Sequence, residues 1–109
     1  MAEANQQGSI HIGEGVSVTG SLVVPDIISI SGRVEGSVTA RQVIVEATGN
    51  VQGKVQAELV DVKGTISEYL AASKSLIIRS TGDVKGTVHY SEIEIEKGGQ
   101  LQGDLYLNT

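Results

Sequence analysis

The most obvious candidates for chemistry are three carboxylates near the end of the chain. Glu92, Glu94 and Glu96 alternate with isoleucines, and paired carboxylates can act as general acid and general base on a glycan. In a strand, this alternation places the charged side chains together on a solvated face, and so short a chain has few residues left to build a cleft around them. We therefore expect an acidic surface stripe and not a glycan-active enzyme.

Two further patterns could hold a metal ion. Residues 98–104 read Gly-Gly-Gln-Leu-Gln-Gly-Asp, close to a calcium-binding repeat, but the third glycine comes two positions late and no second copy completes the site. The only histidines, His11 and His89, lack a second ligand at a usual metal spacing. We expect no catalytic residue, no metal site and no cofactor.

The composition excludes other classes of function. The 109 residues include no Cys, so disulfides, thiolate catalysis and Cys-ligated metals are excluded. The 8 Lys+Arg against 13 Asp+Glu give a net charge of -5, which predicts no nucleic-acid surface. The sequence has no apolar run of a membrane span, no signal peptide and no phosphate-binding glycine loop. A cytoplasmic protein that does not use nucleotides is expected.

A repeat of about 17 residues must position these side chains. The pattern aliphatic-x-Gly-x-aliphatic begins at positions 18, 34, 51, 84 and 101, and a copy at 66 has Glu68 in the glycine place. A second aliphatic pair follows nine or ten residues after the starts at 18, 34, 51, 66 and 84, for example Val43 and Val45. Ile10 and Ile12 form the same pair for an incomplete first unit. Such alternation is typical of strands with one buried face. At Glu68 we expect a local bulge, with a partner contact as the alternative.

Short strands at one spacing can stack only by winding in one direction. We predict an all-β, single-domain parallel β-helix (β-solenoid) of about six turns over residues 9–107, with residues 1–8 as a flexible tail and 108–109 as the C-terminal end. Two glycine columns, one through Gly36 and one through Gly49, are predicted at corners that need a positive φ or leave no room for a Cβ. One predicted core column contains Leu22, Val38, Val55, Leu70, Val88 and Leu105. A predicted surface charge ladder contains Glu46, Lys63, Arg79 and Glu96.

The repeated Val-x-Gly-x-Val pattern, its following aliphatic pair and the final segment 98–105 resemble the bactofilins over about residues 8–107. The resemblance implies a right-handed, roughly triangular β-helix that polymerises without nucleotide into apolar cytoskeletal filaments. It also implies partners in cell-wall synthesis or remodelling and a role in cell shape or polar organisation. Family members often carry an N-terminal membrane-targeting peptide, whereas residues 1–7 here are polar. Membrane contact is therefore expected only through partners, at the inner face of the membrane.

The ends of the predicted solenoid carry the functional expectation. A solenoid needs polar caps to stay monomeric, and neither end of the sequence shows an amphipathic capping helix. We therefore predict a structural protein whose partner is itself, joined end to end. The alternative is a non-polymerising β-helical module that presents a flat face to a protein or glycan, and the particle size in buffer without nucleotide separates the two. The predicted contact residues are Ile10, Ile12, Leu101, Leu105, Tyr106 and Leu107.

Overall fold

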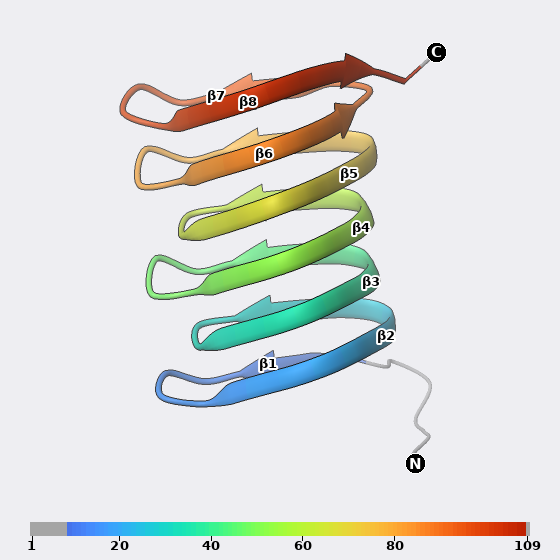
Figure 1. The fold of residues 1–109 in the computed structure, drawn as a ribbon, viewed down its shortest axis with the longest axis vertical. Coiled ribbons are helices and arrows are strands. Elements are labelled where there is room, and N and C mark those ends of the chain that lie inside the picture. Colours follow the sequence, from blue (N-terminus) through green and yellow to red (C-terminus); the bar gives the residue numbers. More distant parts are fainter. Residues whose placement is uncertain (1–8, 109) are drawn as a thin grey trace.

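In the computed structural model, which describes residues 9–108, the chain winds into a stack of parallel strands (Figure 1). Each long strand crosses the front of the molecule, bends around one edge and returns along the back (Figure 1). The strands are β1 (Ile10–Ile12), β2 (Ser17–Ile30), β3 (Arg33–Val45), β4 (Asn50–Val62), β5 (Thr65–Ile78), β6 (Asp83–Tyr90), β7 (Ile93–Ile95) and β8 (Gln100–Leu107). The expected tail, residues 1–8, and Thr109 lie outside the described residues.

Every strand pairing is parallel, which confirms the predicted β-solenoid of about six turns. The sheet order is β1-β2-β3-β4-β5-β6-β8, and β7 pairs with β5. Among the described residues there is no helix with the length and hydropathy that a membrane span needs. The fold is thus built from one structural unit that repeats along the axis.

The core is made of aliphatic columns, as predicted. The register aligns Leu22 with Val38 and continues through Val55, Leu70 and Val88 to Leu105. No polar or charged side chain among the described residues is buried. Each buried Val, Leu or Ile contributes roughly 1.5 to 3 kcal/mol, so stacked aliphatic side chains can form a core without Phe or Trp.

The glycine column through Gly36 forms one corner of each turn. Val34 and Val38 are fully buried, so regular alternation would also point residue 36 inward, yet it is exposed. Its φ of 128° turns the backbone outward, which confirms the predicted positive φ. Glu68 occupies the same corner with φ 94°, and the register passes through it without a break. The expected bulge at Glu68 is therefore wrong, and the irregularity between these strands lies at Ala57/Leu59.

The second half of each turn forms the back of the molecule in Figure 1, which we call the back sheet. Register shifts at Val24/Ile27 and at Ala57/Leu59 lie where the chain passes from the front to the back. The varying repeat length is therefore absorbed partly at this edge. The back sheet comprises residues 10–12, 27–30, 42–45, 59–62, 75–78 and 93–95, paired in parallel from turn to turn.

Candidate functional site

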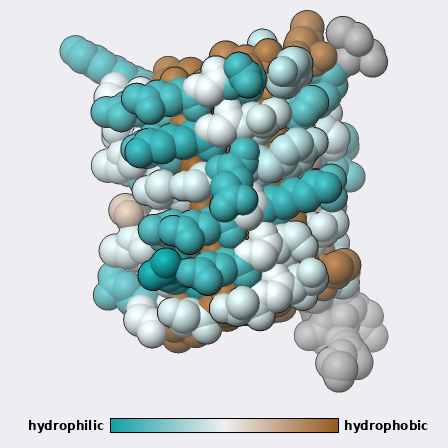
Figure 2. Space-filling view, viewed as in Figure 1, coloured by the Kyte–Doolittle hydropathy of each residue, from teal (hydrophilic) through white to brown (hydrophobic). Residues whose placement is uncertain are grey.

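The C-terminal turn leaves apolar side chains uncovered. Leu105 is 46% exposed although it continues the core column beyond Val88, and Leu107 is 57% exposed. Leu101 is half-buried against the core, and Ile95 is exposed on the same turn. No described strand pairs with the outer edge of β8. Apolar side chains gather along this edge, at the top of Figure 2.

The N-terminal turn is also apolar at its open edge. Ile10 is exposed, whereas Ile12 is only 5% exposed because it packs into the core. Val16 and Val23 are exposed as well, and Val23 reaches 78%. Neither valine is among the contact residues predicted from the sequence. The sequence does carry a signal for Val23, because it is an apolar residue in an outward-facing column whose next member is Thr39. The six predicted contact residues thus lie in two groups at opposite ends of the rod.

Val16 occupies a position where later turns have glycine. Its carbonyl accepts a hydrogen bond from Arg33 N at 2.9 Å, as the Gly32 carbonyl does from Asn50 N at 2.9 Å. A Cβ added to Gly32 would lie less than 3.0 Å from the carbonyl oxygens of Val16 and Gly13 in the preceding turn, as predicted for a corner without room. Val16 meets no such turn, because the described chain has none before it. A side chain can therefore replace the column glycine at the open end of the stack, where no preceding turn lies against it.

Tyr106 points away from the core and extends an aromatic row on the outer surface. Its ring stacks on His89 with centroids 5.1 Å apart, and the His89 ring lies 5.4 Å from the ring of Tyr69. Lys54 Nζ lies 5.3 Å from the centroid of the Tyr69 ring. His89 is thus a surface residue held between aromatic rings. The row reaches the C-terminal edge of the described rod.

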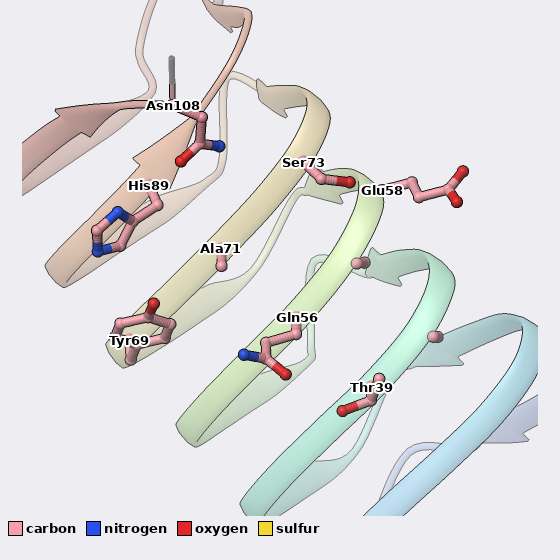
Figure 3. Close-up of a pocket in the computed structure, with 10 residues that line it drawn as sticks. Thr39, Gln56, Glu58, Tyr69, Ala71, Ser73, His89 and Asn108 are labelled. Carbon is pink, nitrogen blue, oxygen red and sulfur yellow. The ribbon is translucent and has the colours of Figure 1, made fainter.

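A shallow hollow of about 490 Å³ lies beside this row (Figure 3). The small Ala71 side chain leaves space between Gln56 and His89 on the neighbouring turns (Figure 3). Its one lining carboxylate, Glu58, forms an ion pair with Lys74 at 3.4 Å. Across residues 9–108, no three His, Asp or Glu side chains are placed to share a metal ion. The lining therefore does not supply the pair of carboxylates that glycan hydrolysis uses.

Arg79 connects three successive turns at the edge where the back sheet runs into the loops, which we call the loop edge. It binds Asp61 at 3.0 Å and Glu96 at 2.9 Å, while Glu46 and Lys63 pair at 3.5 Å. The hydrogen bonds that Arg79 donates to Asp61, and then the one that it donates to Glu96, raise the pKa of the Arg79 guanidinium above its already high ordinary value. The predicted charge ladder is confirmed, with Glu46 paired to Lys63 and Arg79 to Glu96, and Asp61 is an additional member. The ladder attaches the C-terminal turn to the rest of the rod.

We expect Arg79→Met to loosen the turn that contains β7. This strand pairs with β5 over only three residues, so the Arg79–Glu96 ion pair adds a side-chain contact to a short ladder. An ion pair as exposed as this one contributes only modestly to stability. Amide hydrogen exchange of β7 should accelerate roughly three- to tenfold. Lys63→Met, which removes a cation from the same ladder but lies two turns from Glu96, should leave β7 exchange unchanged. Equal acceleration of β7 exchange in both variants would show that the Arg79–Glu96 ion pair is not what stabilises this turn.

Comparison with known proteins agrees with this architecture. The family model described as "Bactofilin: Polymer-forming cytoskeletal" matches residues 10–106. Bactofilin BacP of Myxococcus xanthus (strain DK1622) is 26% identical over 103 residues, which cover 94% of this chain and 42% of BacP. Bactofilin BacO of the same strain is 22% identical over 95 residues, covering 86% of this chain and 75% of BacO. The chain thus spans less than half the length of BacP.

No solved structure gives a significant match, so the fold assignment stands on the geometry described above. The family model nevertheless covers nearly all of the described residues, from β1 to all but the last residue of β8. The resemblance noted in the sequence is therefore confirmed. The chain belongs to the bactofilin family, whose members are structural, polymer-forming proteins of the cytoskeleton and not enzymes.

Proposed function

We propose that this chain is a filament subunit that joins end to end without nucleotide and so scaffolds cell shape or cell-wall machinery. The observation that carries the proposal is the uncovered apolar surface at both ends of the rod, with Leu105 and Leu107 at one end and Ile10 and Val23 at the other. Covering half of one such side chain contributes about 1 kcal/mol. Contact between ends therefore has a clear driving force.

The open backbone edges support the same proposal. The outer edge of β8 and that of the first half of β2 carry N–H and C=O groups that no described strand pairs with. Unpaired strand edges are templates for association with another chain. A second copy of this chain would satisfy those groups and cover the apolar side chains in one step.

Val16 supports an apolar filament, in which like ends meet. A head-to-tail joint that continued the solenoid in register would press the Val16 side chain against loop carbonyls of the next subunit, because every later turn has glycine there. Contacts between two C-terminal turns and between two N-terminal turns avoid that clash. Such a filament would lie in the cytoplasm and reach the inner face of the membrane through cell-wall synthesis or remodelling partners.

Assembly should not depend on nucleotide. We expect the same polymer mass by sedimentation, and the same filaments by electron microscopy, with or without ATP, GTP and Mg²⁺, because the chain has no phosphate-binding glycine loop. A change in polymer mass on adding nucleotide would contradict this prediction. A chain that stays monomeric at all concentrations would overturn the proposed function and favour the alternative of a β-helical binding module.

A further inference from the structure

The back sheet carries aliphatic side chains on its outer surface, which we call the lateral stripe. In register, Ile44 lies beside Ser29 and Asp61, so its aliphatic neighbours are diagonal, one turn before and one turn after. Each member is half-buried. The stripe therefore runs in a zigzag along the axis over four turns. Its members are Ile27, Ile44, Leu59 and Ile77.

The stripe is not a general property of this solenoid. The outward column that passes through Glu35 and Gln52 at the front is polar in every turn. In the back sheet, by contrast, Leu76, Ile77 and Ile78 follow one another, with the first and third fully buried and Ile77 facing outward. Parallel strands that are apolar on both faces are typical of sheets covered on both faces. The described chain itself covers only the inner one.

Charged residues border the stripe on both sides. One border is the edge where the chain bends from the front to the back, which we call the bend edge. There Asp26 pairs with Arg41, and Glu58 pairs with Lys74 at 3.4 Å, so the charge alternates from turn to turn. Along the loop edge runs the ladder that includes the Glu46–Lys63 pair. One charge lies within the stripe, because Asp61 separates Ile44 from Ile77, and Arg79 neutralises it at 3.0 Å. A mainly apolar centre within a charged rim is the usual anatomy of a protein–protein contact.

We propose that the lateral stripe is the contact between subunits of neighbouring filaments, with back sheet against back sheet and the rod axes antiparallel. This inference rests on the proposed function, because it needs filaments. A single two-fold axis relates the two subunits. It runs along the strand direction, perpendicular to the rod, and passes between the turns of β3 and β4. It brings each side chain of the second turn opposite one of the fifth, and each of the third opposite one of the fourth.

Charge complementarity on this axis identifies a second copy as the occupant. Asp26 would face Lys74 of the other subunit, Arg41 would face Glu58, and Glu46 would face the other subunit's Lys63. A parallel arrangement with turns level would bring the bend edge against the loop edge, where Arg41 would meet Glu46 and Glu58 would meet Lys63, but Lys74 would meet Arg79. Only the antiparallel register pairs opposite charges at every one of these positions. Opposite charges across an interface set the register and exclude wrong partners.

The aliphatic side chains are complementary on the same axis. Ile27 of one subunit would lie diagonally opposite Ile77 of the other, and Ile44 diagonally opposite Leu59. The residue directly opposite Ile44 would be Asp61. The members of each pair are offset by two residues along their strands, so their side chains can interdigitate. Antiparallel neighbours are always available, because an apolar filament contains subunits in both directions.

The contact is too small to hold two isolated subunits together. Four half-buried side chains and their rim fall below the roughly 1,200 Å² of total surface that a stable interface buries. A filament repeats the contact in successive subunits, and linked weak contacts gain orders of magnitude in avidity. Lateral association should therefore begin only after end-to-end assembly.

Ile44→Lys tests the stripe, and Gln52→Lys, which adds the same charge on the polar front, is its matched control. Wild-type filaments should form bundles that sediment at low speed, and Ile44→Lys should lower the bundled fraction about tenfold while single filaments still sediment at high speed. Gln52→Lys should bundle like the wild type. Bundles that survive Ile44→Lys, or wild-type filaments that stay single, would overturn the inference and leave the proposed function intact.

A charge reversal tests the antiparallel register. Arg41→Glu and Glu58→Arg should each lower the bundled fraction severalfold, and the double variant should restore it to within about twofold. Failure of the double variant to recover would contradict this register. If the wild type instead coats phosphatidylglycerol vesicles, and Ile44→Lys abolishes the coating, the stripe is a membrane contact and the inference is wrong. An absence of filaments would overturn the inference together with the proposed function.

Discussion

Replacing Leu105 by Arg is expected to give a folded, β-rich chain that sediments as a monomer, or at most as a dimer joined through the N-terminal turn. Leu105 ends a core column at an open edge, and its 46% exposure leaves room for an Arg side chain in the isolated subunit. In a joint between two ends, the guanidinium would lose water without gaining a partner, at a cost of several kcal/mol. This corresponds to a loss of about three decades or more in the association constant.

Gln102→Arg is the matched control, because it adds the same charge to β8 at an exposed outward position. It should polymerise like the wild type, as seen by sedimentation velocity and electron microscopy. Leu107→Arg, at a more exposed site, should repeat the effect of Leu105→Arg at a smaller cost to folding. Long filaments from both leucine variants would show that the C-terminal turn is not a subunit joint.

The fold could be read from the sequence because a solenoid repeats one local rule. Each aliphatic or glycine position lies next to its equivalent one turn away, so spacing alone gives the register that aligns Gly53 with Glu68. The same rule does not give the path of the backbone between faces. The length of the turn around Ala57 depends on how the chain packs at that edge. The sequence pattern instead predicts the irregularity at Glu68, because a glutamate stands there in the glycine place.

The ends were harder to predict for a physical reason. A repeat pattern describes an interior turn, which has a neighbour on each side, whereas exposure at an end depends on which neighbour is missing. Ile12 belongs to the first pair yet is covered by the core, while Val23 looks like an ordinary outward residue yet is 78% exposed. Val16 could have been found from the sequence as the valine that replaces a column glycine.

Replacing Gly53 by Ala is expected to lower the free energy of unfolding by about 3 kcal/mol or more, because two costs add at this corner. Gly53 has a φ of 136°, which strains any residue with a Cβ. The added Cβ would also lie less than 3.0 Å from the carbonyl oxygen of Gly36, a backbone atom that its own strand holds in place. The midpoint temperature of thermal unfolding should fall by roughly 12 °C or more. The measurement belongs in the Leu105→Arg background, where filaments add no stability.

Two other positions in the same column separate the two costs. Gly20 has nearly the same φ, 130°, but nothing lies within 4 Å of an added Cβ, so Gly20→Ala should cost only the backbone strain, about 1 to 2 kcal/mol. Glu68 already bears that strain at φ 94°, and Glu68→Gly should stabilise the chain by about 1 kcal/mol after the larger entropy of glycine in the unfolded state is subtracted. Equal losses for Gly20→Ala and Gly53→Ala would show that the contact between turns is not the cause. A less stable Glu68→Gly would show that the Glu68 side chain contributes more than its backbone strain removes.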